Sequence, residues 1–288
     1  MKPPKPWCSY VGSITTTGLN SSSTRAREIS VVSVPDRHRD RPLVVGHRGA
    51  SLLAPENSLL ALRAGLDAGA DAVEIDVQLS ADGVPVVFHD RLLQRTTNID
   101  EVFPERHHLP LSSFSYEELS QLQLRGPQGL SGERIPTLDQ VPQVLGDHAQ
   151  LFVEVKEPAH SPGIIQLLIG RLTQDPVFSS LVAQHRLRCI SFDHATIRDV
   201  VAGVPGLHGQ YLVDQPPSRH VVIDAARHCL SMGTNHRTLD TTTVRAVHEH
   251  GMALSVYTVN TVADVQRVTE LGVDVITTDD PRLVPSGS

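Results

Sequence analysis

Two hydrophobic patterns alternate along the chain from residue 43 onward. Short apolar runs rich in branched residues predict strands. Apolar residues that recur every three or four positions predict helices between most of these strands, for example over 161–172, 241–250 and 261–271. The predicted strands cover residues 43–46, 72–79, 84–88, 151–155, 189–192, 210–213, 253–256 and 273–276.

An earlier helix is expected after Asn57 or Ser58, either of which can cap its first turn. Alternation of strands and helices over about 240 residues predicts an α/β fold with a mainly parallel sheet, and a closed (β/α)8 TIM barrel fits the length. The alternative is an open doubly wound sheet, but its glycine fingerprint for a dinucleotide is missing from the sequence, as is a phosphate-binding P-loop.

The connection between the second and third predicted strands is too short for a regular barrel. Only residues 80–83 separate them, with the turn signal Asp82-Gly83, whereas a parallel crossover needs about a dozen residues or more. We therefore expect an irregular barrel around strands 2 and 3. A second irregularity is the stretch of about 91–137, which interrupts the pattern and is predicted to be a small insertion that covers the substrate.

The first 41 residues differ from the rest, being polar and rich in hydroxyl groups without helical or alternating periodicity. We expect a disordered or weakly ordered tail over 1–41 and a barrel domain over 42–288. The tail lacks the apolar core of a secretory signal peptide, which favours a cytoplasmic location.

Composition excludes several classes of protein. No apolar run approaches the roughly 18–20 residues of a membrane-spanning helix, so no transmembrane segment is expected. A net charge of −7 argues against a nucleic-acid partner. Three scattered cysteines form neither a disulfide framework nor a cysteine-rich zinc site.

Acidic residues alternate with apolar ones on two predicted strands. Glu74, Asp76 and Gln78 share one face of the first, and Glu154 shares a face with Lys156 on the second. On an open antiparallel sheet such faces would simply be solvated. Inside a barrel, however, the buried carboxylates would repel one another and require a cation. An oxygen-rich site of this kind suits Mg²⁺ or Ca²⁺ rather than zinc.

Two histidines follow predicted strands, His47 within Gly-His-Arg-Gly and His89 after Val-Val-Phe. Barrel active sites lie at the carboxyl ends of the strands, which makes both histidines candidates for catalysis. Arg48 would add a planar fork suited to phosphate. Lys156 is one of only three lysines, in a chain whose other basic residues are arginines, and supplies a compact charge.

These residues belong to short motifs that resemble the glycerophosphodiester phosphodiesterase family in order and spacing, from about residue 43 to 281. The motifs are Gly-His-Arg-Gly-Ala at 46–50, Ala-Pro-Glu-Asn-Ser at 54–58, Glu-Ile-Asp-Val-Gln at 74–78, Asp-Gly at 82–83, His-Asp at 89–90, Arg-Thr-Thr at 95–97, Ile-Pro-Thr-Leu at 135–138, Glu-Val-Lys at 154–156, Thr-Val-Asn at 258–260, Gly-Val-Asp at 272–274 and Thr-Asp at 278–279.

The resemblance implies a metal-dependent TIM barrel that hydrolyses a small-molecule glycerophosphodiester to sn-glycerol 3-phosphate and an alcohol. It implies that Glu74, Asp76 and Glu154 ligate one divalent cation, Mg²⁺ or Ca²⁺. It further implies that His47 and His89 are the acid/base pair. Arg48 and Lys156 would bind the phosphate.

The chain departs from the family pattern at three places. Ser58 and Tyr257 stand where the family often has threonine and tryptophan, and residues 98–103 replace a glycine-rich turn. The last two departures concern the choice of substrate more than the type of reaction.

Three other functions would use a similar site. A lysophospholipase D-type enzyme would need an apolar groove, which Phe103, Leu109, Leu111 and Phe114 of the insertion could supply. A non-catalytic barrel that binds a phosphorylated ligand would lack at least one histidine or carboxylate, and none is missing. An enolising barrel would need acids on three successive strands, and the placement of the two histidines argues against it.

Overall fold

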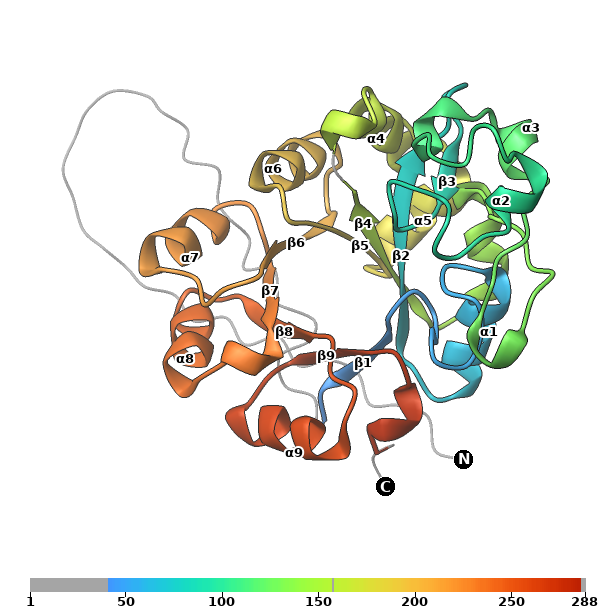
Figure 1. Ribbon diagram of the computed structural model, residues 1–288. Coiled ribbons are helices and arrows are strands. Elements are labelled where there is room, and N and C mark those ends of the chain that lie inside the picture. The colour runs from blue at the N-terminus through green and yellow to red at the C-terminus, as the bar shows by residue number, and fades with distance from the viewer. Residues whose placement is uncertain (1–40, 157, 286–288) are drawn as a thin grey trace, which may run out of the picture. The chain divides into compact units, whose positions relative to one another are not determined.

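The computed structural model describes residues 41–156 and 158–285, and Figure 1 shows a central ring of strands surrounded by helices. Eight parallel strands follow the order β1-β9-β8-β7-β6-β5-β4-β2, and pairing of β1 with β2 closes the barrel. The strands of the barrel are β1 (Leu43–Gly46), β2 (Ala72–Leu79), β4 (Gln150–Val155), β5 (Leu187–Ser191), β6 (His208–Val213), β7 (Ser231–Asn235), β8 (Ala253–Tyr257) and β9 (Val275–Thr278).

Helices on the outside of the ring connect most successive strands (Figure 1). The α-helices are α1 (Leu59–Asp67), α2 (Ile99–Val102), α3 (Tyr116–Leu119), α4 (Ile164–Gln174), α5 (Pro176–Ala183), α6 (His194–Gly203), α7 (Arg219–Ala225), α8 (Thr241–Glu249) and α9 (Val262–Leu271). Short 3-10 helices are η1 (Leu111–Ser113), η2 (Pro127–Gly129), η3 (Leu138–Val144), η4 (Pro158–His160), η5 (His236–Thr238) and η6 (Pro281–Leu283).

The TIM barrel predicted from the sequence is confirmed, but the predicted set of strands contains one error and one omission. The segment 84–88 is not a barrel strand: its strand β3 (Pro85–Val87) pairs antiparallel with the end of β2. Residues 80–83 are too few for a crossover, so the chain reverses in a hairpin, with Gly83 at a φ of 79°. This hairpin accounts for the irregularity expected there.

The eighth barrel strand is β7, which the hydrophobic pattern did not indicate. Its sequence Ser-Met-Gly-Thr-Asn has a single large apolar residue, Met232, and this side chain packs in the outer core. The face that points into the barrel carries Ser231 and Gly233. Side chains from the neighbouring strands fill the barrel interior beside β7, so β7 needs no large side chains of its own. Its sequence therefore has no apolar pattern, although the strand is buried.

Apolar side chains fill two separate layers of the barrel. The larger core lies between the strands and the helices, and it includes Val73, Ile75 and Val77 of β2. A smaller cluster fills the barrel interior, on the same strand faces as Glu74 and Glu154; it consists of Leu43, Val45, Ala72, Phe152, Ile190, Leu212 and Val275. The acidic residues of β2 and β4 therefore point inward, above a packed apolar floor.

The segment of residues 88–135, which lies between β3 and η3, has a hydrophobic core of its own. Leu111 and Phe114 are almost fully buried there, and the half-buried Phe103 and Leu109 pack against the same cluster. The expectation that these four side chains supply an exposed apolar groove is therefore wrong. The prediction that this segment covers the substrate stays a prediction.

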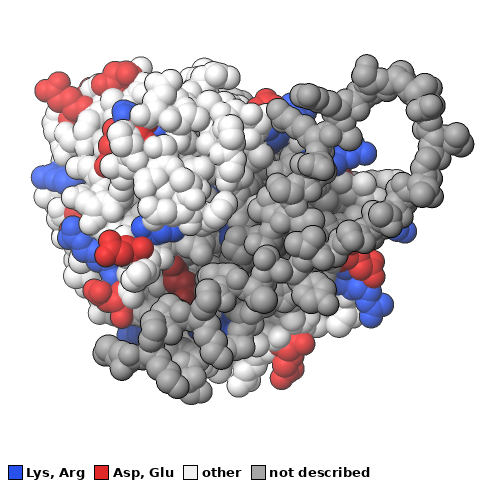
Figure 2. Space-filling model, turned by 180° about the vertical axis from the view of Figure 1, so that it is seen from behind, with Lys and Arg blue, Asp and Glu red and all other residues white. Residues whose placement is uncertain are grey.

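Other expectations from the sequence concern the surface and the tail. Within the described residues, no helix is both long and apolar enough to span a membrane. Basic and acidic side chains are interspersed over the part of the described surface that is visible in Figure 2. The predicted tail, 1–41, lies outside the described residues except for its last position.

Replacement of Leu111 by alanine tests the separate core of the 88–135 segment. Leu111 is 1% exposed, so we expect Leu111→Ala to lower the free energy of unfolding by about 2–5 kcal/mol, measured by urea denaturation. The matched control is Leu130→Ala in the same segment, where the side chain is 44% exposed and the expected change is about 0.5 kcal/mol or less. Equal effects of the two substitutions would contradict this packing.

Candidate active site

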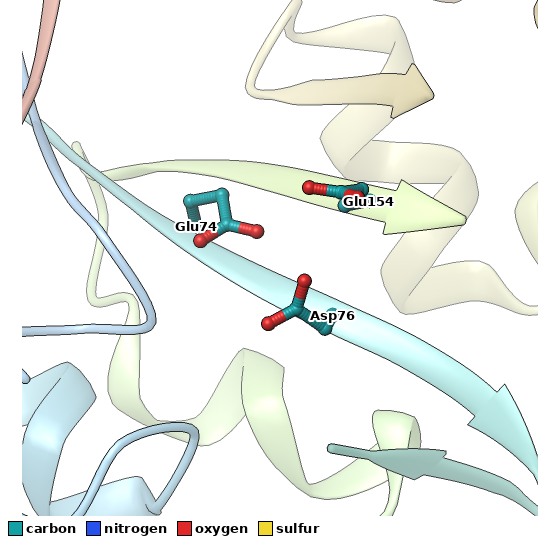
Figure 3. Close-up of side chains that lie close together, drawn as sticks. All are labelled: Glu74, Asp76 and Glu154. Atoms are coloured by element: carbon teal, nitrogen blue, oxygen red, sulfur yellow. The ribbon is translucent and has the colours of Figure 1, made fainter. Parts of the chain in front are cut away.

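Three carboxylates from two neighbouring strands converge inside the barrel (Figure 3). Glu74 and Asp76 project from β2 and Glu154 from β4, where the sheet register pairs Asp76 with Glu154. One oxygen from each residue lies within 4.8 Å of the other two. All three residues are buried. The structure thus brings together the acidic residues that the sequence singled out.

Burial and mutual repulsion perturb these acids. Burial, followed by the charges of Asp76 and Glu154, raises the pKa of Glu74 well above its usual value. Burial and the charge of Asp76 also raise the pKa of Glu154, although Lys156 opposes this effect. Burial alone would raise the pKa of Asp76, but the charges of Arg48 and Lys156 outweigh burial and lower this pKa. Two of the three acids are therefore harder to ionise than a free carboxyl group, because they are buried beside other carboxylates.

The donor set suits a hard divalent cation. Glu74 Oε1 is buried and accepts no hydrogen bond from any described residue, although its other oxygen accepts the Arg48 backbone N–H at 2.9 Å. A buried carboxylate oxygen without a donor is costly unless a cation contacts it. Three carboxylates around one point are oxygen ligands of the kind that Mg²⁺ and Ca²⁺ prefer.

Basic and amide side chains contact the oxygens of the carboxylate cluster. Lys156 Nζ donates to Glu154 Oε1 at 2.6 Å and lies 3.6 Å from Asp76 Oδ1. Arg48 Nε lies 3.4 Å from Asp76 Oδ2. Asn57 donates to the same Asp76 oxygen at 2.8 Å, while the hydroxyl of Ser58 caps α1. Of the two proposed caps, Ser58 is the correct one, and Asn57 instead fixes a carboxylate of the site.

Each of the two candidate histidines bonds to an aspartate. His47 Nδ1 lies 2.6 Å from Asp279 Oδ1, and His89 Nδ1 lies 2.6 Å from Asp90 Oδ1. A carboxylate at Nδ1 favours the tautomer that carries a proton there and leaves Nε2 for other partners. Both imidazoles line one cavity, so both can present Nε2 to the same ligand.

The two aspartates are held differently. Asp279 accepts hydrogen bonds from the neutral groups of Ser51, at 2.7 Å, and Asn260, at 2.5 Å. Burial opposes ionisation of Asp279, but the hydrogen bond and charge of His47, together with these donors, lower its pKa to about 2. Asp90 is instead bonded by the Arg95 guanidinium at 2.5 Å. Both carboxylates therefore stay ionised near neutral pH.

Arg95 also joins the two halves of the site. Its terminal nitrogens donate to both oxygens of Glu56 at 2.7 Å, and Glu56 in turn accepts from Arg48 at 2.8 Å. The Arg95 guanidinium thus connects Asp90, which bonds to His89, with Glu56, which bonds to Arg48. Sequence reasoning gave no role to Glu56, Asp90, Arg95 or Asp279. Asp90 directly follows His89, and Asp279 directly follows β9, so position could have indicated both aspartates. Glu56 and Arg95 had only their membership of the motifs at 54–58 and 95–97.

The cavity has a charged wall and an apolar wall, and its volume is about 190 Å³. Arg48, Lys156 and the two histidines line the charged wall, together with Glu74 and Glu154. Across the barrel, Ile190 and Leu212 lie below an edge-to-face pair of Phe192 and Tyr257, whose ring centroids are 5.8 Å apart. The Tyr257 hydroxyl donates to the Val213 carbonyl at 2.8 Å, which fixes the ring. The cavity therefore suits a small ligand with one anionic end and one uncharged end.

Comparisons with known proteins agree with this geometry. The sequence profile of the Glycerophosphoryl diester phosphodiesterase family matches residues 47–283. The chain is 30% identical over 254 residues to a glycerophosphodiester phosphodiesterase of Bacillus subtilis, covering 85% of each chain. It is 32% identical over 250 residues to one of Caldanaerobacter subterraneus, covering 84% of this chain and 96% of the relative.

A solved structure shares the fold. The structure of an Oleispira antarctica phosphodiesterase, in complex with the product sn-glycerol-3-phosphate, matches with a TM-score of 0.70 and 27% sequence identity. The match covers 84% of this chain and 94% of that one.

Substitution of Glu74 by glutamine tests the charge imbalance of the cluster. Since the pKa of Glu74 is raised in the folded state, its ionisation costs stability once the pH rises above about 4.5. Without metal, Glu74→Gln should therefore raise the melting temperature at pH 7, and the gain should shrink toward pH 4. The same substitution should weaken binding of Mg²⁺ or Ca²⁺ at least about tenfold in calorimetric titration. The control is Glu117→Gln on the exposed side of α3. If Glu74→Gln instead lowers the melting temperature of the metal-free protein at pH 7, that result contradicts repulsion among the three carboxylates.

Proposed function

Because this chain belongs to the Glycerophosphoryl diester phosphodiesterase family, we propose that it hydrolyses water-soluble glycerophosphodiesters, such as glycerophosphocholine or glycerophosphoethanolamine, to sn-glycerol 3-phosphate and an alcohol. One observation carries the proposal: two histidines, each bonded to an aspartate, line a small cavity together with two of the three clustered carboxylates. Phosphodiester hydrolysis needs both a proton carrier and a means to offset negative charge.

Glu74, Asp76 and Glu154 hold one divalent cation, Mg²⁺ or Ca²⁺, in this proposal. When bound, the cation offsets the negative charge that develops on the phosphate oxygens. The support is the donor set itself, together with the unpartnered oxygen of Glu74.

Arg48 and Lys156 bind the non-bridging oxygens of the phosphate. Both side chains line the cavity and are largely buried, so little solvent screens their charges. The burial of Lys156 favours its neutral form, but Glu154 and Asp76 outweigh this effect and raise its pKa, so the ammonium keeps its proton at neutral pH. Asn57 and Glu56 hold Asp76 and Arg48 in place from outside the cavity.

His47 and His89 carry the protons. One removes a proton from the nucleophile, and the other protonates the departing alkoxide, steps that typically contribute about 10²–10⁴-fold each. Asp279 and Asp90 hold the Nδ1 proton of their histidines and stabilise the imidazolium when it forms. Two separate aspartates allow the two imidazoles to be in opposite protonation states at the same time.

The size of the cavity and the packing of the insertion favour a water-soluble substrate. A lysophospholipid would need an apolar surface for its acyl chain at the mouth of the barrel. The side chains expected to form it are packed into the core of the 88–135 segment instead. A lysophospholipid phosphodiesterase is therefore the weaker candidate. A non-catalytic binder is weaker still, because all seven predicted site residues are present and six of them line the cavity.

Hydrolysis of glycerophosphocholine tests the proposal directly. Chelator-treated protein should release no sn-glycerol 3-phosphate, and addition of Mg²⁺ or Ca²⁺ should restore release, measured with a coupled dehydrogenase assay. Release that is unaffected by chelation would remove the metal from the proposal. Absence of release with either metal, followed by release from a lysophospholipid, would favour the alternative substrate.

Replacement of either histidine separates catalysis from binding. We expect His47→Ala and His89→Ala each to lower kcat by at least about 10²-fold, because each removes a proton carrier. The melting temperature and calorimetric metal affinity should stay close to those of the wild type. His220→Ala, on the exposed surface of α7, is the control and should leave kcat unchanged. A loss of stability as large as the loss of activity would assign the histidine a structural role.

A further inference from the structure

We propose that Gln210 on the apolar side of the cavity binds the glycerol half of the substrate, by donating a hydrogen bond from its side-chain amide to a glycerol hydroxyl oxygen, and that Arg188 holds the amide in this orientation. The inference rests on the proposed function for the identity of the ligand. Its geometric basis is independent of that function, because it comes from a buried polar group that neither the metal cluster nor the histidines use.

Gln210 is a buried polar residue in the barrel interior. It projects from β6, is 2% exposed and lines the same cavity as the two histidines. The register of the sheet runs from Asp76 through Glu154 and Ile190 to Gln210 on four adjacent strands. These side chains share the inner face of the barrel, so Gln210 faces the ligand from a wall different from that of the carboxylates.

The orientation of the Gln210 amide is determined by its neighbours. Its Oε1 accepts hydrogen bonds from Arg188 Nη1 and from the Ser231 hydroxyl, both at 3.0 Å. A guanidinium has only donors, so the oxygen of the amide must face Arg188 and the nitrogen must face away. Gln210 therefore presents a donor, not an acceptor, on its other side.

Arg188 is itself fixed in the barrel interior. It is 2% exposed, its guanidinium lies over the Phe152 ring at 4.2 Å, and its Nη1 also lies 3.5 Å from the Ser231 hydroxyl. An arginine held in this way cannot follow a rotation of the amide. Arg188 thus acts through Gln210 as a positioning residue and has no contact with the ligand.

Gly233 supplies the space in which the Gln210 amide nitrogen lies. A Cβ atom at Gly233 would lie 2.9 Å from Gln210 Nε2 and 2.5 Å from a methyl group of Leu212. No hydrogen bond joins Nε2 to any residue that the structure describes. Gln210 lines the cavity, so an amide donor that its neighbours hold in one orientation there is placed to meet an oxygen of a bound ligand.

The position of Gln210 selects the part of the substrate that it contacts. Its neighbours in the cavity, Ile190 and Leu212, are apolar, whereas Arg48 and Lys156 lie with the carboxylate cluster on the charged wall. With the phosphate at that charged wall, the group that reaches Gln210 is the organic part of the substrate. The glycerol half is common to all glycerophosphodiesters and carries the hydroxyl oxygens that such a donor recognises.

Calorimetric binding of two ligands tests the inference without the need for turnover. In the presence of Mg²⁺, the wild type should bind sn-glycerol 3-phosphate more tightly than inorganic phosphate, because only the former reaches Gln210. Gln210→Met keeps the length of the side chain and removes the donor. It should raise the Kd of sn-glycerol 3-phosphate about tenfold, the cost of a buried hydroxyl left without a partner, and change the Kd of phosphate less than about twofold.

Three variants complete the experiment. Gln143→Met, at an exposed glutamine of η3, should leave both affinities unchanged. Arg188→Met should produce the same selective loss for sn-glycerol 3-phosphate, because the amide is then free to turn. Ser231→Ala removes the other donor to Oε1 and should produce a smaller loss of the same kind. It keeps the test available if the larger substitutions prevent folding.

The outcomes separate this inference from the proposed function. Equal weakening of both ligands by Gln210→Met, no weakening of either, or no preference for sn-glycerol 3-phosphate in the wild type overturns the role of Gln210. If glycerophosphocholine is hydrolysed in such a case, the proposed function stands and only the inference fails. A selective loss in a protein that hydrolyses no glycerophosphodiester supports the binding role and removes the proposed activity.

Discussion

Electrostatic repulsion among Glu74, Asp76 and Glu154 is the constraint around which the site is organised. Strand alternation and the register of β2 with β4 place these carboxylates on the inner face of the barrel, where little water reaches them. Three buried negative charges are unfavourable unless cations and donors surround them. The chain provides Lys156 and Arg48 within 4 Å of the cluster, and the negative charge that these two cations leave unneutralised makes the site compatible with a divalent metal ion.

Close packing of loops onto the barrel makes this arrangement rigid. The turn after β1 carries His47 and Arg48, and Gly49 within it has a φ of 88°. A Cβ atom at Gly49 would lie 2.4 Å from the backbone of Ala61 in α1, so only glycine lets the turn approach the helix this closely. On the other side of the site, the Gln78 amide donates to three successive backbone carbonyls, from Phe88 to Asp90, which fixes the turn that carries His89.

The interior of the barrel thus has two chemical regions that meet at the cavity. At the cavity, the β1, β2 and β4 side carries carboxylates, basic side chains and His47, whereas β5 to β8 contribute apolar side chains and the Gln210 amide. A phosphodiester has the same division between an anionic centre and a hydroxylated organic group. In the proposals above, recognition of the phosphate and of the organic group depends on different strands, so substitutions on β6 are expected to alter affinity for the organic group and leave affinity for the phosphate unchanged.

The sequence by itself determined the fold class, because strand and helix periodicities alternate and parallel strands with helical crossovers bury both faces of a sheet. It also determined that Glu74, Asp76 and Glu154 would meet, since alternation places them on the inward faces of two strands. It did not reveal β7, whose side chains leave no apolar pattern, or the antiparallel pairing of β3, which follows from a short hairpin.

Only the tertiary structure decided which partners complete the site. Asp279 is 232 residues from His47, and Glu56 is 39 residues from Arg95, so no local pattern indicates either pair. The orientation of Gln210 likewise depends on Arg188 and Ser231, from the strands on either side of β6. Local periodicity specifies which face of a strand a side chain occupies. Contacts across the barrel also depend on how the strands are ordered and staggered, and only closure of the sheet determines these.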